Sequence, residues 1–319
     1  MLSLKIKKIV IVIAVCISVG SSVAAATNGN AHPQAQLLPT ENTADTIQLP
    51  AVSEMAVSTP MPADYDDIKG IVNILLIGTD EKSTAYDDQG RGDVTLLCSI
   101  NADKKSVKLI SFERSTGVPW PGHGDIMLTS TYAYGGPQLT VESLSRSFDI
   151  ELDGYVHVDF EGFSNIIDAM GGVDIYLTAA EAQAVTEDLW YEQFFTEGDC
   201  HLDGAATLRY CRLRRIDDNW NRVQRQRNAV QAVINKGKSL RIAGIKKLAE
   251  VAIPLVDTNL SKKQLASLIF SAPKLAGVQA EQMTVPDRNR VWSYDGVDGA
   301  VTGCDHAYES ERIRQFIYG

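Results

Sequence analysis

The chain has 319 residues, of which 45% are apolar and 22% are charged, and its formal net charge at pH 7 is -10. This composition is ordinary for a globular protein, and the length suits one large α/β domain or two small domains. The acidic total argues against a protein that coats nucleic acid, because the overall field repels phosphates. A DNA-binding regulator is therefore the weakest of the functional alternatives.

The N-terminal segment combines lysines with a long apolar run. Three lysines between residues 5 and 8 precede an apolar stretch without charges that ends near Ala26. A basic start followed by about 20 apolar residues is typical of a membrane anchor, and the small residues at its end also suit cleavage of a secretory signal. Residues 1–26 are therefore predicted to be an anchor or a signal. Both alternatives export the rest of the chain, either as a single-pass membrane protein with an extracellular C-terminal domain or as a secreted protein.

The remaining chain divides into a linker and one folded domain. Residues 27–67 are rich in Ala, Thr and Pro and lack apolar periodicity, which predicts a flexible linker. Short β-branched runs between turn residues predict strands, and longer apolar-periodic segments predict helices. Strands are expected at 71–78, 94–100, 107–112, 154–160 and 173–177, and helices at 139–148, 161–172, 222–236 and 261–276. This alternation predicts a single α/β/α layered domain over 68–319, with a central sheet flanked by helices.

One stretch of this acidic chain is unusually rich in arginine. Residues 208–227, LRYCRLRRIDDNWNRVQRQR, contain seven arginines and no lysine. The planar guanidinium group makes paired hydrogen bonds to phosphate and stays charged when it is desolvated. Several such groups converging on one place favour a pyrophosphate site. The alternative is a solvated charged face paired with Asp217 and Asp218.

The spacing of these residues indicates which of them act together. Arg222, Arg225 and Gln226 have the i, i+3, i+4 spacing that places side chains on one face of a helix. Arg212 and Arg214 alternate just upstream, so in an extended segment both side chains point the same way. These five residues are therefore candidates for one anion site.

A second group of charged residues lies at the expected strand ends. Asp80 ends the first strand and Asp93 precedes the second. Two carboxylates at neighbouring strand ends repel each other unless a cation lies between them or one is protonated. Mg²⁺, or alternatively Mn²⁺, with phosphate oxygens in its remaining positions fits this pair. Arg114 ends the third strand near the same edge. The alternatives are that the aspartates are turn or cap residues and that Arg114 forms a surface ion pair.

Seven motifs form an ordered series along the chain: NILLIGTD (73–80), RGDVTLLCSIN (91–101), SFERST (111–116), YAYGGP (132–137), YVHVDFEGFSNIIDAMGGVDI (155–175), HLDGAATLRYCRLR (201–214) and NRVQRQ (221–226). Together they resemble the LytR-CpsA-Psr family of cell-wall glycopolymer transferases, with the core motifs inside 71–236. The resemblance implies a sheet flanked by helices with an apolar tunnel for a polyprenyl lipid. It also implies a phosphotransferase that moves a glycopolymer, such as wall teichoic acid or capsule, from undecaprenyl pyrophosphate to a peptidoglycan sugar hydroxyl.

The resemblance also assigns roles to individual residues. Asp80 and Asp93 would bind Mg²⁺, and one of them would accept the proton of the attacking hydroxyl. The pyrophosphate would contact Arg91, Arg114, Arg212, Arg214, Arg222, Arg225 and Gln226. The catalytic set would be Arg114, Arg212, Arg214, Arg222, Arg225 and Asp93.

The chain departs from the family pattern at three places. Ser115 stands where the family often has Asp, and Met127 and Thr129 stand where it often has Lys and Asn. Asn219 stands where it usually has Asp, and an aspartate of 217–218 could supply that carboxylate instead. Two other functions stay open: a polyprenyl-pyrophosphate phosphatase that uses water as the acceptor, and a non-catalytic protein that binds lipid-linked precursors. Export permits disulfides, but spacing does not decide how Cys98, Cys200, Cys211 and Cys304 would pair.

Overall fold

The structure is a computed structural model that describes residues 70–80, 90–237, 248, 250–261, 264, 275 and 277–319. The predicted anchor (1–26) and linker (27–67) lie outside these residues, as does most of the predicted helix at 261–276. Within the described ranges, no helix has the length and apolar character needed to cross a membrane.

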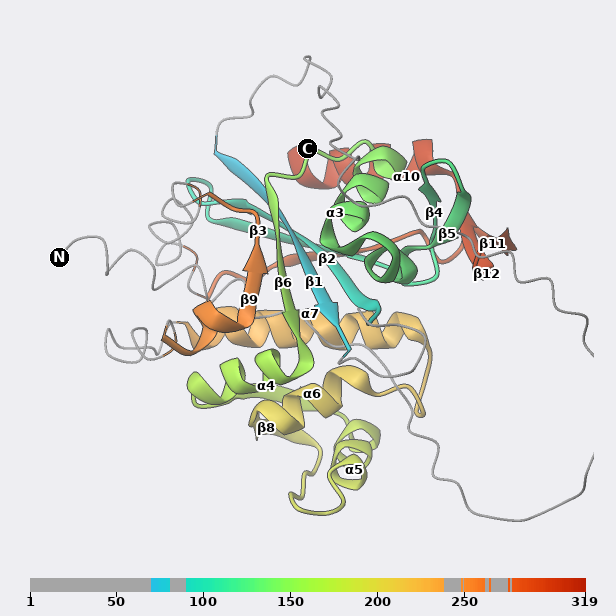
Figure 1. Ribbon diagram of the computed structural model, residues 1–319. Coiled ribbons are helices and arrows are strands. Elements are labelled where there is room, and N and C mark those ends of the chain that lie inside the picture. The colour runs from blue at the N-terminus through green and yellow to red at the C-terminus, as the bar shows by residue number, and fades with distance from the viewer. Residues whose placement is uncertain are drawn as a thin grey trace, which may run out of the picture. The chain divides into compact units, whose positions relative to one another are not determined.

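A mixed six-stranded sheet, with the order β10-β3-β2-β1-β6-β9, forms the centre of the domain (Figure 1). Its strands are β1 (Ile71–Thr79), β2 (Gly92–Asn101), β3 (Ser106–Phe112), β6 (Gly154–Asp159), β9 (Val256–Thr258) and β10 (Glu281–Val285). β2 is antiparallel to both β1 and β3, whereas β6 is parallel to β1 and β10 is parallel to β3. β2 is buried along its whole length, as expected for a strand covered on both faces.

Helices cover both faces of this sheet (Figure 1). One face carries α3 (Leu128–Phe148) and α10 (His306–Tyr318), and the other carries α4 (Phe160–Ala169), α6 (Gly204–Arg212) and α7 (Asn219–Lys236), with α5 (Ala179–Asp188) packed against α6. Successive strand side chains point to opposite faces, so the core forms two apolar layers. Ile74 and Leu76 pack with the α4–α7 side, and Leu75 and Ile77 pack with the α3 and α10 side. The predicted α/β/α layered fold is confirmed.

Smaller elements surround the sheet. Three two-stranded sheets pair β4 (Gly117–Trp120) with β5 (Gly124–Met127), β7 (Val173–Leu177) with β8 (Gly198–Leu202), and β11 (Val291–Gly296) with β12 (Gly299–Cys304), and a 3₁₀ helix, η2, covers Ile253–Leu255. The strand predicted at 173–177 therefore exists, but it pairs with β8 instead of joining the central sheet. The four cysteines of the described part are free thiols.

Aspartates fix where the three helices α4, α6 and α7, on one face of the sheet, begin. Asp159 accepts a hydrogen bond from the Gly162 amide at the start of α4, and Asp203 accepts one from Ala206 at the start of α6. Asp218 accepts one from the backbone N of Asn221, 3.0 Å away, at the start of α7. These are N-caps, which satisfy amides that have no partner inside the helix.

Candidate functional site

The end of β1 and the start of β2 bring Asp80 and Asp93 together at one edge of the sheet. The strands are antiparallel, so Thr79 pairs with Gly92, after a shift in register at this point. The backbone N of Arg91 donates to Asp80 Oδ1 at 2.8 Å. Burial raises the pKa of Asp80; the hydrogen bond from Arg91 offsets part of this rise, and the charge of Asp93 adds to it. The two carboxylates therefore influence each other, as expected from their positions at neighbouring strand ends.

Arg114 binds the buried member of this pair. Its Nη2 atom lies 2.8 Å from Asp93 Oδ1, and the side chain of Asp93 is 0% exposed. Thr129 Oγ1 donates to the same carboxylate oxygen at 3.2 Å, and the Thr129 amide donates to the carbonyl of Arg114 at 2.9 Å. The alternative that Arg114 forms a surface ion pair is wrong, because the carboxylate that it binds is fully buried.

Three further arginines approach the same region from α6, from the loop after it and from α7. Burial lowers the pKa of Arg212, Arg214 and Arg222, and for Arg222 the value falls to about 10. Among the charges that act on all three is that of Asp93, which favours their protonated forms. Arg222 is 0% exposed. The alternative of a solvated charged face is therefore wrong for this part of α7.

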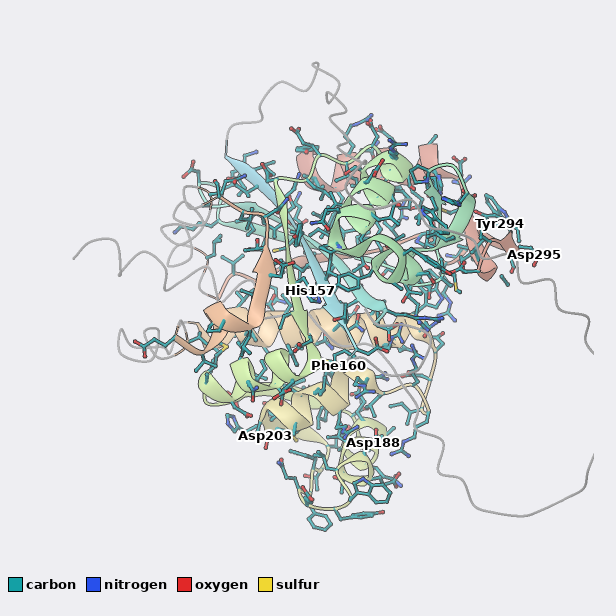
Figure 2. The ribbon with its side chains drawn as sticks, in the orientation of Figure 1. His157, Phe160, Asp188, Asp203, Tyr294 and Asp295 are labelled. Carbon is teal, nitrogen blue, oxygen red and sulfur yellow. The ribbon has the colours of Figure 1, made fainter. Side chains whose placement is uncertain are left out.

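Arg212 reaches the site from a helix and not from an extended segment. It is the last residue of α6, and the chain turns away at Leu213, which has φ -55° and ψ 125°. The prediction that Arg212 and Arg214 alternate along an extended stretch is thus wrong, although both lie near Asp93. The guanidinium of Arg212 lies over the ring of Phe160, 4.8 Å from the ring centroid. Phe160 begins α4 directly after β6 (Figure 2), so this stack holds the arginine at the end of the sheet.

Several guanidinium donors in this group lack acceptors. Among the residues that the structure describes, no hydrogen-bond partner exists for Nε of Arg114 or for Nε and Nη2 of Arg214, and all three atoms are buried. An unsatisfied buried donor is costly, typically about 1–3 kcal/mol and more for a charged group. The three donors therefore mark a place that an anionic acceptor would fill.

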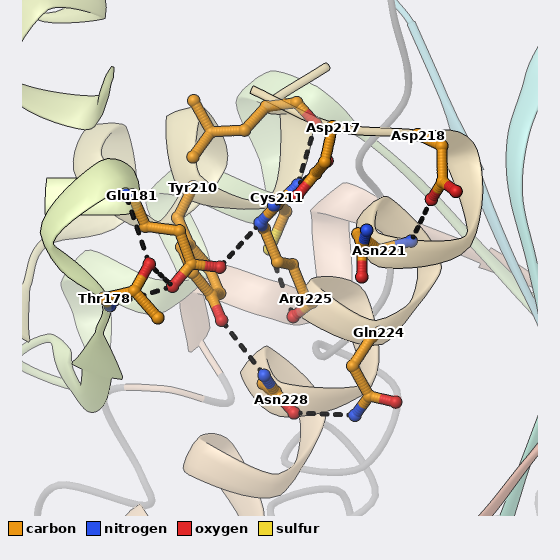
Figure 3. Close-up of polar contacts among 11 residues, drawn as sticks. Thr178, Glu181, Tyr210, Cys211, Asp217, Asp218, Asn221, Gln224, Arg225 and Asn228 are labelled. Atoms are coloured by element: carbon orange, nitrogen blue, oxygen red, sulfur yellow. Dashed lines mark hydrogen bonds and ion pairs between the residues drawn. The ribbon is translucent and has the colours of Figure 1, made fainter. Parts of the chain in front are cut away.

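Arg225 belongs to a separate cluster (Figure 3). Its Nε donates to Glu181 Oε1 at 2.8 Å, and its Nη1 donates to the Leu213 carbonyl at 3.0 Å and to Asp217 Oδ1 at 3.1 Å, while Nη2 also contacts Asp217. Burial acts to lower the pKa of Arg225, but the hydrogen bonds to both carboxylates outweigh it and raise the value. The structure thus places Arg225 in a bridge between α5 and α7 and not beside Asp93, because both carboxylates occupy its guanidinium.

Gln226 and Arg91 are the two remaining residues predicted to contact the pyrophosphate. Gln226 is 4% exposed on α7. Arg91 is exposed, and its carbonyl accepts the Asp93 amide at 2.9 Å. Its backbone therefore shapes the Asp80–Asp93 edge. The phosphate contacts expected of the Gln226 and Arg91 side chains stay predictions.

Glu113 is a carboxylate of this region that the sequence analysis missed. It follows β3, is 3% exposed, and its backbone N donates to the Val285 carbonyl at 2.8 Å. Its charge favours the protonated forms of Arg214 and Arg222. The sequence feature that could have identified Glu113 is an acidic residue at the end of an otherwise apolar strand, in SFERST.

This residue also contacts the start of α7. Asn219 Nδ2 donates to Glu113 Oε1 at 3.2 Å. Of the two aspartates predicted to supply the carboxylate missing at 219, Asp217 binds Arg225 of α7 and Asp218 caps that helix. The acidic partner of the α7 start thus comes from the residue that follows β3.

The Mg²⁺ site predicted at Asp80 and Asp93 stays a prediction, with which the residues present are compatible. In the described part of the chain, no group of three or more His, Cys, Asp or Glu residues could hold a metal. Mg²⁺ usually keeps several waters and binds through one or two carboxylates plus substrate phosphates. Two aspartates whose like charges repel each other therefore fit this ion, and no third protein ligand is needed.

The model of the LytR_cpsA_psr family matches residues 37–306. The chain belongs to this family. TagT of Bacillus subtilis, named a polyisoprenyl-teichoic acid–peptidoglycan teichoic acid transferase, is 31% identical over 225 residues, which are 69% of this chain and 70% of that protein. TagU of Bacillus cereus, with the same activity in its name, is 34% identical over 201 residues, 61% of this chain and 62% of that protein.

Solved structures of the LytR_cpsA_psr family share the fold. A structure of TagT bound to LI-WTA superposes with a TM-score of 0.64 at 25% identity and covers 80% of this chain and 92% of that one. A structure of the family protein YwtF (TagT) with a bound octaprenyl pyrophosphate lipid has a TM-score of 0.60 at 24% identity, covering 80% and 93% of the two chains.

Proposed function

We propose that this chain is a phosphotransferase that moves a glycopolymer from a polyprenyl pyrophosphate to a sugar hydroxyl of peptidoglycan. One observation carries the proposal: Arg114 and Arg214 have buried guanidinium donors without acceptors beside the Asp93 carboxylate. Guanidinium groups match phosphate oxygens in shape and charge. A diphosphate presents enough oxygens to satisfy several of these donors at once.

The relatives support the same substrate class. The TagT and TagU proteins are named as teichoic acid transferases that act on peptidoglycan. Solved structures have TagT bound to LI-WTA and to an octaprenyl pyrophosphate lipid. The polyprenyl part of such a lipid is apolar, and its removal from water is favourable by about 25 cal/mol per Å². We therefore place it in an apolar tunnel that leads to the arginines, with wall teichoic acid or a capsule-like polymer as the cargo.

The residues act mainly by charge and position. Mg²⁺ held by Asp80 and Asp93, with Mn²⁺ as an alternative, would neutralise part of the diphosphate charge when bound. Arg114, Arg214 and Arg222 stabilise the charge that spreads over the phosphoryl oxygens in the transition state. The acceptor oxygen bonds to the glycan-bearing phosphorus, the bond from that phosphorus to the bridging oxygen breaks, and polyprenyl phosphate leaves. The hydroxyl proton passes to Asp80 or Asp93.

This reaction moves a glycan from a membrane lipid to the cell wall, so it requires the domain outside the membrane. We accordingly propose an extracellular domain, with residues 1–26 either as an anchor that holds it at the cell membrane or as a signal whose cleavage releases it as a secreted protein. The run of apolar residues after the N-terminal lysines supports export.

The test uses the full chain with a polyprenyl-pyrophosphate-linked glycan, peptidoglycan fragments and Mg²⁺. Release of polyprenyl phosphate and covalent attachment of the glycan are measured together. We expect Arg214→Ala to lower both by roughly 100-fold or more and EDTA to lower both as well. Arg215→Ala is the matched control, because Arg215 is exposed and binds Glu187 at 2.6 Å. Equal rates for Arg214→Ala and the wild type would refute the proposal, and release without attachment would favour the phosphatase alternative.

A further inference from the structure

The Glu113 side chain joins two parts of the site that are far apart in the sequence. Its Oε2 accepts hydrogen bonds from the Ser115 amide at 2.7 Å and from Ser115 Oγ at 2.5 Å. Its Oε1 accepts from Asn219 Nδ2, at 3.2 Å. All three partners are donors, so an ionised carboxylate is the side chain that satisfies them together.

The turn that carries Arg114 is held from its other side as well. Ser115 Oγ lies 2.7 Å from Thr302 Oγ1, and the Thr302 amide donates to the Ser115 carbonyl at 2.7 Å. Because the Ser115 hydroxyl donates its proton to Glu113, the Thr302 hydroxyl donates to Ser115. The Arg114 turn is therefore fixed between β12 and the Glu113 carboxylate.

Glu113 also balances charge inside the site. It is 3% exposed, and it lies close enough to Arg214 and Arg222 to favour their protonated forms. The third cation near it is Arg114, the next residue in the chain. A buried arginine is tolerated when a carboxylate compensates its charge, and Asp93 and Glu113 supply the two compensating charges.

Glu113 contacts two neutral donors, Ser115 and Asn219. Both stand at positions where the chain departs from the family pattern. An aspartate at 219 would bring a second carboxylate to the distance now spanned by a hydrogen bond. Two carboxylates that close cannot both be ionised without a large penalty. The serine, the asparagine and the glutamate are therefore matched to one another.

We propose that Glu113 is a positioning residue of the transfer site, which ties the Arg114 turn to the first residue of α7 and so orients Arg114 and Arg222 toward the diphosphate. The inference deepens the proposed function and depends on it for its kinetic consequence. Glu113 acts through the arginines and has no contact with the substrate of its own.

The first test is Glu113→Gln, which keeps the size of the side chain but removes the negative charge that compensates Arg214 and Arg222. We expect kcat to fall about 10- to 100-fold. The KM for the lipid-linked substrate should change by less than about threefold. The variant disturbs only the geometry of the transition state, so the interactions that bind the substrate in its ground state are kept. Glu187→Gln, in the exposed pair with Arg215, is the control and should keep the wild-type kcat.

The second test separates a matched pair from a merely structural contact. Asn219→Asp should lower turnover about tenfold or more at pH 8 and recover as the pH approaches 5, since one of the two carboxyls then carries a proton and can donate to the other. Glu113→Gln combined with Asn219→Asp should recover most of the activity at pH 8, because the glutamine amide can donate to the new aspartate. Asn221→Asp adds the same charge at an exposed position of the first turn and should lack this pH dependence.

The melting temperature provides a readout that needs no substrate. The melting temperature of Asn219→Asp, measured relative to that of Asn221→Asp, should be lower at pH 8 than at pH 5. The double variant should not show this difference. The same pH dependence for Asn219→Asp and Asn221→Asp, or an unchanged kcat for Glu113→Gln, would overturn the inference. A wild type without any turnover would instead count against the proposed function, and the melting comparison would still decide whether Glu113 and position 219 are matched.

Discussion

Replacing Arg222 by methionine is expected to keep or raise the stability of the fold while it abolishes turnover. Arg222 is 0% exposed, and burial lowers the pKa of its guanidinium to about 10, against an ordinary value of roughly 12.5. At about 1.4 kcal/mol per pKa unit, the charged side chain is disfavoured in the fold by about 3 kcal/mol. Replacing a whole buried ion pair by apolar side chains is often neutral or stabilising by about 1–4 kcal/mol. The pKa of Arg222 is lowered even with the charges of Asp93 and Glu113 counted, so its charge is likewise a net cost to the fold.

Arg225→Met on the same helix provides the contrast. Its loss would leave the Leu213 carbonyl without this donor and would remove the cation shared by Glu181 and Asp217. Removing one partner of a buried ion pair typically destabilises by about 3–5 kcal/mol. For a domain of this size that lowers the melting temperature by roughly 10 °C, and turnover well below that temperature should fall less than in Arg222→Met.

The assay pairs thermal unfolding with turnover of the lipid-linked substrate. The wild type should gain melting temperature when a polyprenyl pyrophosphate is added, because the ligand binds only the folded state. Arg222→Met should lose most of this gain. The reasoning would be refuted if Arg222→Met unfolded several degrees below the wild type and still turned over substrate, or if the two methionine variants behaved alike.

Two further predictions concern β6 and the start of α4. Burial lowers the pKa of His157 below its ordinary 6.5, although Asp257 and Asp159 partly oppose this. His157 therefore binds a proton more readily in the unfolded chain than in the folded chain. The wild type should accordingly lose stability as the pH falls below about 6.5. His157→Gln should lose less, as denaturant unfolding at pH 8 and pH 5.5 would show. Phe160→Leu removes the ring under Arg212, and kcat/KM should fall about two- to tenfold, compared with Phe163→Leu, a buried core position on the same helix.

The sheet and the aspartate pair were predictable because their determinants are local. Apolar runs specified β1, β2 and β3 to within two residues at each end, and neighbouring strand ends brought Asp80 to Asp93. The role of Glu113 was not predictable, because Asn219, one of its partners, lies 106 residues away. Helix spacing predicted that Arg222 and Arg225 share one face of a helix, and the structure shows that both are buried. The spacing could not show that carboxylates from outside the helix bind Arg225.

At position 222 of the arginine-rich stretch, burial explains why arginine stands in place of lysine. Burial lowers the pKa of Arg222 to about 10, and the same environment would lower a lysine from about 10.4 to about 8. A lysine there would be partly neutral in mildly alkaline conditions, whereas the arginine stays charged. Arg222→Lys should therefore keep some turnover at pH 6.5 and lose it as the pH rises through about 8, measured as the ratio to the wild type at each pH. A ratio that does not change with pH would mean that position 222 contributes shape, and that its charge is not what the diphosphate requires.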